Sequence, residues 1–407
     1  MSMPWRTVLR VSVAPRIGIL LILWLIAYRG NVTELITTGY WESVAAQSTS
    51  LLVWTAPAVA ACAAWEGLRI RQSRALQGAP ARSFGSVSFT ALTPTLLLGA
   101  LAVTLGLGLL LPQAAGSPDW TVAAILALEL LVVAAHTAIG YVIGLSLPRL
   151  LAIPVALVGS FVWMAYPAAM NIFWVRQLNG TNLAECCSLN QVAAPRSMVA
   201  PALVATGLIL AARLVTVRQR SLRILAPAAL AVAVAVSAWI AHPLGYSAAT
   251  SRSLASRTCT GTQPRVCLWP EQHHFASDVV AWATDAHTRL AALDITTAAE
   301  LSPTSSTPTS NDVRSLVAAS ALPRDIPECA KHGKWPGSLA FGPLSAWLTI
   351  KAGADPQVVV SRYTPAEAQD ATRILQRPAR AQTVWFKQNV KTLNRCDLQP
   401  VLDPERF

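Results

Sequence analysis

Charged residues are scarce in this chain, and lysine is missing from its first 242 residues. Only 13% of the 407 residues are charged, whereas 53% are hydrophobic and the mean hydropathy is +0.45. A soluble domain carries about 25% charged residues. The composition therefore excludes a wholly soluble globular protein. It predicts a membrane protein with room for one further domain of ordinary size.

The net charge of +12 does not indicate a nucleic-acid partner. Residues before about Pro243 hold 15 Arg and 6 acidic residues, and the remainder holds 17 basic and 14 acidic residues. The excess lies in short loops between apolar runs, where orientation in a bilayer explains it. We therefore expect the lipid bilayer as a partner and no nucleic acid.

Nucleotide-binding and metalloenzyme motifs are also missing. A phosphate-binding loop needs G-x-x-x-x-G-K-[ST], and the nearest string, HGKWPGS, lacks that spacing. The string RVCLWPEQHH, residues 265–274, gathers a cysteine and two histidines, but no H-E-x-x-H or C-x-x-C is present. A zinc site needs three or four convergent ligands, and adjacent histidines on a turn point apart. We expect no catalytic residue, no cofactor and no metal, and we interpret this string as structural.

Apolar runs of membrane length recur along the first part of the chain. The first follows Arg6 and Arg10 like a signal peptide, but the RGNVTE that follows offers no small-residue cleavage site, which predicts an uncleaved anchor. The sequence predicts an all-α polytopic membrane protein with about seven transmembrane helices over residues 1–243, and a second domain over residues 244–407. The expected spans are 11–28, 51–65, 87–111, 120–147, 150–170, 199–212 and 224–240.

Arginine counting predicts the orientation of these spans. Seven spans alternate sides, so one side receives twelve arginines and the short loops of the other side receive three. The positive-inside rule then places the N-terminus in the cytoplasm and the C-terminal domain outside, in a multi-pass protein of the cell membrane. The twelve are Arg6, Arg10, Arg16, Arg69, Arg71, Arg74, Arg82, Arg149, Arg213, Arg218, Arg220 and Arg223, and the three are Arg29, Arg176 and Arg196.

Six of the seven cysteines lie on the predicted outside, where disulfides persist: Cys186, Cys187, Cys259, Cys267, Cys329 and Cys396. Four of them fall in the outer domain and allow three pairings. Pairing Cys259 with Cys267 would staple a hairpin, and pairing Cys329 with Cys396 would tie the last helix back. The adjacent Cys186 and Cys187 cannot easily bond each other. For that pair we expect bridges to other partners or one free thiol.

The outer domain is predicted to be mostly helical with a small β-hairpin. The hairpin covers residues 259–269, and helices are expected over 276–293, 336–351, 364–376 and from Pro378 to near Cys396. Thr364 and Glu367 have the spacing of a capping box. The polar stretch LSPTSSTPTSND, residues 301–312, is expected to be a loop.

Two ionisable residues, Glu129 and His136, lie seven positions apart within the fourth span and therefore share a helix face. A carboxylate at membrane depth costs about 3 kcal/mol or more unless it is neutral, paired or facing water. Either these residues line a translocation path, or they make buried hydrogen bonds to a Ser or Thr on a neighbouring helix. Five glycines in the spans more simply predict close helix packing: Gly99, Gly106, Gly108, Gly140 and Gly144.

The order of parts over residues 1–223 resembles the permease subunits of type V ABC exporters. The resemblance rests on the basic N-terminal segment, the basic loop WEGLRIRQSRALQGAPARSF after the second span, and the long stretch NIFWVRQLNGTNLAECCSLNQVAAPRSM between spans five and six. It implies a separate cytoplasmic ATPase subunit, a second permease copy or homologue, and an outer stretch that re-enters the membrane. It also implies an ATPase-coupling loop over residues 66–84, with Glu66, Leu68, Arg69, Ile70, Arg71 and Arg74 as its candidate contacts.

The leading functional hypothesis is thus a permease-like subunit of an ABC export system. One alternative is a non-transporting, membrane-anchored binding or accessory protein that acts through its extracytoplasmic domain. Another is a membrane-bound hydrolase. The cysteine-tryptophan-proline string and the closing helix RPARAQTVWFKQNVKTLNRC resemble outer domains of actinobacterial membrane proteins of unassigned function.

Overall fold

The computed structural model describes residues 10–73, 84–217, 219–323, 325, 327–333 and 335–407. The chain divides into two compact units, residues 1–252 and residues 253–407. The boundary expected at 243/244 lies nine residues later, because strand β2 (Ala249–Ser251) pairs with strand β1 (Gln191–Ala193) of the first unit. We call the two parts the membrane unit and, after the location predicted from its sequence, the outer unit.

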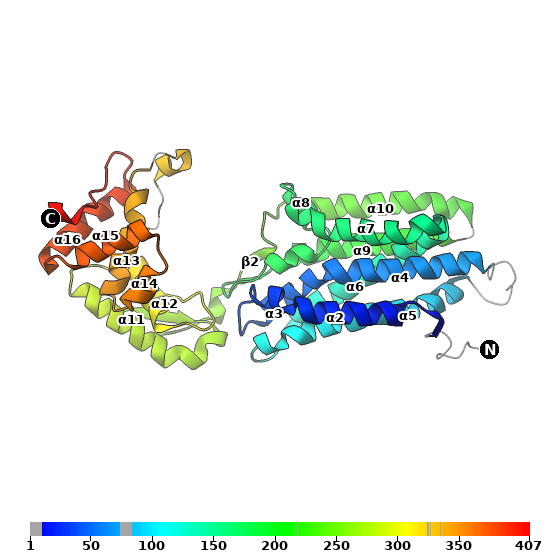
Figure 1. Ribbon diagram of the computed structural model, residues 1–407, viewed down its shortest axis with the longest axis horizontal. Coiled ribbons are helices and arrows are strands. Elements are labelled where there is room, and N and C mark those ends of the chain that lie inside the picture. Colours follow the sequence, from blue (N-terminus) through cyan, green and yellow to red (C-terminus); the bar gives the residue numbers. More distant parts are fainter. Residues whose placement is uncertain (1–9, 74–83, 218, 324, 326, 334) are drawn as a thin grey trace. The chain divides into compact units, whose positions relative to one another are not determined.

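The membrane unit is an all-α polytopic bundle (Figure 1). Its described residues include seven helical segments that are long and apolar enough to cross a membrane. They are Ala14–Thr33, Trp41–Gln72, Gly85–Gln113, Trp120–Ser146, Arg149–Ala169, Pro195–Thr216 and Ser221–Ala241. Large apolar side chains cover its outside, among them Leu20 at 65% and Phe89 at 66% exposed. Surfaces of this kind are stable against lipid rather than water. The expected fold class is confirmed.

The helices of this unit are α2 (Ala14–Thr33), α3 (Trp41–Ser48), α4 (Leu52–Gln72), α5 (Phe84–Leu110), α6 (Trp120–Ser146), α7 (Arg149–Ala165), α8 (Phe173–Arg176), α9 (Pro195–Thr216) and α10 (Arg220–Ala241). The second predicted span, 51–65, is too short. The short turn η1 (Thr49–Leu51) joins α3 to α4 without a break in the helical path, and α4 continues seven residues past Trp65. The second membrane segment is therefore Trp41–Gln72, longer at both ends than the predicted span 51–65.

Glycine determines how closely α4 and α6 approach each other. A Cβ on Gly140 would collide with the backbone carbonyl of Ala60, and one on Gly144 with that of Ala64. Helices approach this closely in membranes only where small residues face each other. The packing role predicted for the span glycines is thus confirmed at these two positions, whereas Gly108 faces open space.

The two ends of the bundle differ (Figure 1). At the basic end, α4, α6 and α9 finish and α2, α5, α7 and α10 begin. At the opposite cap end, short elements gather: α3, η3 (Tyr166–Ala169), α8, η4 (Thr181–Glu185) and the antiparallel pair β1–β2. All twelve arginines counted above lie toward the basic end in sequence, although Arg6, Arg74, Arg82 and Arg218 fall outside the described residues.

The outer unit contains six helices and a three-stranded sheet among its described residues. The helices are α11 (Ala276–Ala291), α12 (Ser310–Ala319), α13 (Ser338–Lys351), α14 (Pro356–Val360), α15 (Pro365–Leu375) and α16 (Ala379–Val390). The hairpin is confirmed, because β3 (Thr258–Thr260) pairs antiparallel with β4 (Arg265–Leu268). The last helix ends at Val390 and is followed by a 3-10 turn, so it stops before Cys396.

The prediction of a loop over residues 301–312 is wrong at both ends of that stretch. Strand β5 (Glu300–Leu301) runs parallel to β4, and α12 begins at Ser310. The helix starts there because Thr309 and Asp312 form a capping box, with the Asp312 carboxylate accepting from Thr309 Oγ1 at 2.6 Å. The predicted box of Thr364 and Glu367 is also present, at the start of α15.

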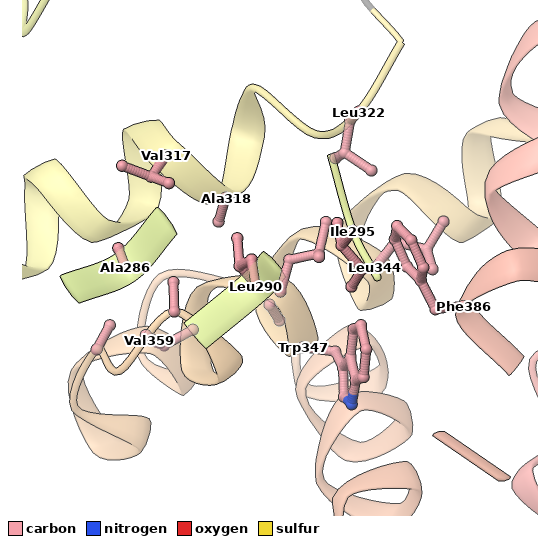
Figure 2. Close-up of a cluster of buried hydrophobic side chains, with 14 of the residues drawn as sticks. Ala286, Leu290, Ile295, Val317, Ala318, Leu322, Leu344, Trp347, Val359 and Phe386 are labelled. Atoms are coloured by element: carbon pink, nitrogen blue, oxygen red, sulfur yellow. The ribbon is translucent and has the colours of Figure 1, made fainter. Parts of the chain in front are cut away.

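A single hydrophobic core holds the outer unit together (Figure 2). Leu290 of α11, Val317 of α12 and Leu344 of α13 are fully buried in it. Trp347 lies 5.3 Å from Phe386 between ring centroids and donates its indole N–H to Gln382 Oε1 at 3.1 Å. A buried indole with its hydrogen bond satisfied is a stable centre for such a core.

Three disulfides are present. Cys259 bonds Cys267 across the hairpin, and Cys329 bonds Cys396 near the end of the chain, as expected. The expectation for the adjacent pair is wrong, because Cys186 and Cys187 bond each other. Their peptide bond is cis, which brings the two Cα atoms to 3.1 Å.

Candidate functional site

The two histidines of RVCLWPEQHH lie at the surface. His273 and His274 are exposed in the turn η6 (Pro270–Phe275), and His287 on α11 is hydrogen-bonded to Thr297 Oγ1 at 2.7 Å. The described residues contain no group of three His, Cys, Asp or Glu side chains that could hold a metal ion. Trp269 is buried, whereas Pro270 is exposed.

The structural role in this string belongs to Gln272, which sequence reasoning missed. Its side chain is fully buried and accepts from the backbone N–H of Trp269 at 2.9 Å. It also donates to the carbonyls of Pro303 and Ser305, at 3.1 and 2.6 Å. Gln272 therefore joins the hairpin to the segment that follows β5. The sequence carried no signal for this role, because the residue three positions earlier is Trp269 rather than the Ser or Thr of a capping box.

Glu129 and His136 are both buried in α6, but they contact different helices. Glu129 Oε1 accepts from Ser48 Oγ of α3 at 2.9 Å, and His136 Nδ1 lies 2.6 Å from Ser160 Oγ of α7. Each thus makes the interhelical hydrogen bond that we weighed against a translocation path. The second oxygen of Glu129 has no hydrogen-bond partner among the described residues. These two residues hold α6 to its neighbours at two depths.

The predicted coupling loop does not begin at Glu66. Residues 66–72 continue α4, and Glu66, Leu68 and Ile70 are buried at 0%, 3% and 6% exposure. Buried residues follow one another on more than one face of α4 here, so the helix is stabilised by packing where a loop was expected. The candidate contacts at these three positions are therefore buried within the protein, and Arg74 lies outside the described residues.

Two arginines of that stretch remain accessible at the basic end. Arg69 is 36% exposed and pairs with Glu66, with 2.6 Å between Nη2 and Oε2. Arg71 is exposed and donates to the Leu145 carbonyl at the end of α6, at 3.3 Å. Of the part of this stretch that the structure describes, the accessible end is thus Arg71, Gln72 and Ser73.

At the cap end, residues 173–185 fold back against the bundle. Asn179 donates to the carbonyls of Trp163 and Met164, at 2.9 and 3.1 Å, and Thr181 Oγ1 reaches the latter carbonyl at 3.2 Å. Gly180 has a φ of +87°, which favours glycine, and its α-carbon faces α6 and α9. The long outer stretch is therefore buried among the helix ends and satisfies carbonyls that α7 leaves free.

Other contacts fix this segment to the chain that follows α10. The Arg176 guanidinium lies over the Tyr246 ring, 4.1 Å from its centroid, and Gln177 donates to the Gly245 carbonyl at 3.2 Å. Elsewhere at the cap end, buried Glu42 of α3 accepts from the backbone N–H of Ala193 in β1 at 3.0 Å. The cap is thus held by buried polar contacts at several points.

Beneath the cap lies a pocket of about 550 Å³. Its apolar wall comes from α2, α4 and the end of α7, with Val32, Val53 and Met164. Its polar wall comes from α3 and η4, with Gln47 and Glu185, and includes the adjacent disulfide Cys186–Cys187. A concave site with one apolar and one polar wall suits an amphipathic small molecule.

An aromatic cluster lies between α2 and α7 on the side of this pocket. Trp54 of α4 is in contact with Trp24 and Tyr28 of α2, at 5.1 and 5.7 Å between ring centroids, and with Phe161 of α7 at 5.7 Å. Tyr28 itself lines the pocket. Trp24 and Phe161 are 47% and 39% exposed on the apolar outside of the unit. The cluster therefore extends from the pocket to the lipid-facing surface.

Comparison with known proteins adds one likeness. A family model described as a domain of unknown function, DUF7224, matches residues 266–396 and so covers most of the outer unit. Comparison with curated proteins and with solved structures gives no match. The outer unit thus resembles a recurrent domain, and the match begins inside β4 and ends at Cys396.

Proposed function

We propose that this chain is a membrane-spanning, permease-like subunit of an ABC export system, powered by a separate cytoplasmic ATPase and paired with a second permease copy or homologue. The observation that carries the proposal is the segment 173–185, which folds back among the helix ends and closes a pocket of about 550 Å³ with α2, α4 and α7. A transport subunit needs such a site within its helices, whereas a plain anchor does not.

The orientation proposed here has the basic end in the cytoplasm and the cap end outside. It is supported by the arginine distribution, because Glu66 is the one acidic residue among the described residues near the basic end. The outer unit follows β2 of the cap, so its two disulfides would lie in an oxidising compartment. The pocket beneath the cap then opens at the outer side of the membrane.

The ATPase would dock where α4 emerges at the basic end, on Arg71 and the residues after it. This replaces Leu68 and Ile70, which are buried. The bond from Arg71 to the end of α6 would transmit movement to the helix that packs most closely on α4. Export would couple docking at this end to opening of the pocket at the other.

Two variants, each with one added cysteine, test both orientation and docking. Cys62 is buried and the other six cysteines are paired, so a new surface thiol would be the accessible one. Gln72→Cys lies at the basic end, and its matched control, Ser117→Cys, lies on an exposed loop at the cap end. In intact cells an impermeant maleimide should label Ser117→Cys and not Gln72→Cys. The opposite pattern would refute the orientation.

The same variants then report on the partner. A bifunctional maleimide cross-linker should join Gln72→Cys to an ATPase subunit identified by mass spectrometry, and should not do so from Ser117→Cys. The affinity-tagged full chain should also retain that ATPase through purification in mild detergent. Retention of no ATPase, together with no cross-link from an intact and correctly oriented chain, would overturn the transport proposal.

A second candidate is a membrane-anchored accessory protein acting through the outer unit. The observation in its favour is that this unit has its own core, its own disulfides and its own family match. On that hypothesis the membrane unit only anchors the domain. Replacing pocket residues such as Gln47 would then leave function intact, whereas replacing surface residues of the outer unit would abolish it.

A further inference from the structure

A second cleft lies at the basic end of the membrane unit, away from the cap pocket. It has a volume of about 370 Å³ and is formed by α5, α6 and α9. Its walls are apolar, with Phe89 and Leu92 of α5, Ala138 and Val142 of α6, and Ile209 of α9. Phe89 is 66% exposed on the outside of the bundle, so the cleft is continuous with the surface that faces lipid.

Among the described residues, one charged side chain borders this cleft. Arg213, in the last turn of α9, lies across it against Gly85 at the start of α5. A Cβ on Gly85 would stand only 2.8 and 2.9 Å from the two terminal nitrogens of the guanidinium. The absence of a side chain at Gly85 thus leaves room for this arginine, and a larger residue would displace it.

The Arg213 guanidinium has N–H groups available for a ligand. It is exposed, and the described residues offer it no carboxylate within ion-pair distance. Glu66, the acidic residue of this end, is paired with Arg69. Two hydroxyls also line the cleft, those of Ser88 and Tyr141, whose oxygens lie 2.8 Å apart. Positive charge and hydroxyl groups therefore stand at one end of an apolar cleft at membrane depth.

We propose that this cleft binds an anionic glycerophospholipid, with its phosphate on Arg213 and one acyl chain between Phe89, Val142 and Ile209. Basic pockets between transmembrane helices are suited to anionic headgroups. Arginine binds phosphate through two parallel N–H groups, which lysine cannot do. The apolar walls require a ligand with a hydrocarbon chain, which excludes free phosphate. The lipid would join α5 to α9 across α6, whatever the chain transports.

Lipid titration of the purified full chain by native mass spectrometry tests the proposal. The probes are phosphatidylglycerol and phosphatidylcholine with identical acyl chains, added to protein in mild detergent. Wild type should bind the first phosphatidylglycerol more tightly than phosphatidylcholine. Arg213→Gln should weaken phosphatidylglycerol binding about fivefold or more, which is the contribution expected of one basic residue at a membrane surface.

Three further variants separate the site from general effects. Arg149→Gln removes an exposed arginine from the same end of the bundle and should leave binding unchanged. Arg213→Lys keeps the charge and should retain part of the preference. Ala138→Phe should fill the cleft and weaken both lipids. The proposal fails if Arg213→Gln binds phosphatidylglycerol like wild type, if Arg149→Gln loses as much, or if a folded Ala138→Phe binds both lipids normally.

Discussion

The disulfide between Cys329 and Cys396 should contribute more to the stability of the outer unit than any other covalent link in it. It closes a loop with a sequence separation of 67, whereas the bond between Cys259 and Cys267 spans a separation of 8. Loop-closure entropy gives about 4.4 kcal/mol for the long loop and about 2.6 kcal/mol for the short one. The difference is about 1.8 kcal/mol in favour of the long-range bond.

The burial of the four sulfurs makes the long-range bond the cleaner test. Cys396 is exposed and Cys329 half-buried, so replacing both with alanine removes little packing. Cys267 is fully buried, so replacing the hairpin pair also removes core contacts. The segment that Cys396 holds contributes Leu393 to the core, and Asn389 bonds the backbone N–H of Val401 at 2.8 Å. Loss of the bond should therefore free the end of the chain first.

Pulse proteolysis of the full chain in increasing urea measures this contribution. The outer unit of Cys329→Ala/Cys396→Ala should become cleavable at a lower urea concentration than wild type, by an amount equivalent to about 4 kcal/mol. The first cuts should fall after α16. A loss below about 1 kcal/mol would refute the entropic argument.

Four further predictions follow from single contacts. Gly144→Leu should destabilise the α4–α6 contact by about 3 kcal/mol or more, whereas Gly108→Leu, which faces open space, should not, as read by thermal unfolding in detergent. Ser48 has one hydroxyl hydrogen but two acceptors within reach, the Ala45 carbonyl at 2.7 Å and Glu129 at 2.9 Å. The amide of Glu129→Gln brings hydrogens of its own, so this change should alter thermal stability by less than about 1 kcal/mol. A large loss would show that the charged carboxylate is required. Gln272→Ala leaves three buried backbone groups without their partner and should cost the outer unit about 3 kcal/mol in a urea titration, and a neutral result would contradict its bridging role. Burial raises the pKa of Asp312, but its hydrogen bonds with Thr309 and Arg362 outweigh this and lower it. The stabilising effect of Asp312 is therefore present above its unfolded-state pKa of about 4 and is lost as the pH falls through the lowered pKa. The deficit of Asp312→Asn against wild type should shrink over that fall in pH, measured by pepsin pulse proteolysis, and a constant deficit would refute the charge argument.

The sequence by itself determined the number of membrane helices and the class of the fold. Backbone groups in lipid must be satisfied within the helix, so long apolar runs allow few alternatives. It also predicted the hairpin and the box of Thr364 and Glu367, because each depends on residues close together in the chain. For Cys259 and Cys267 it offered their bond as one of three possible pairings, and the structure contains that bond. Short range was not always enough, because the bond between the adjacent Cys186 and Cys187 and the capping box of Thr309 and Asp312 were both missed.

Only the tertiary structure decided which polar residues meet and where the chain is accessible. Glu66 looked like the start of a basic loop, but it is buried because the apolar face of α4 continues past it. Gln272 gave no signal beside two histidines, yet it is the buried residue, since its partners come from residues 303 and 305. The cap pocket and the Arg213 cleft each join helices far apart in sequence. Such sites arise from the way helices pack, and packing depends on side-chain shape across the whole bundle rather than on any local pattern.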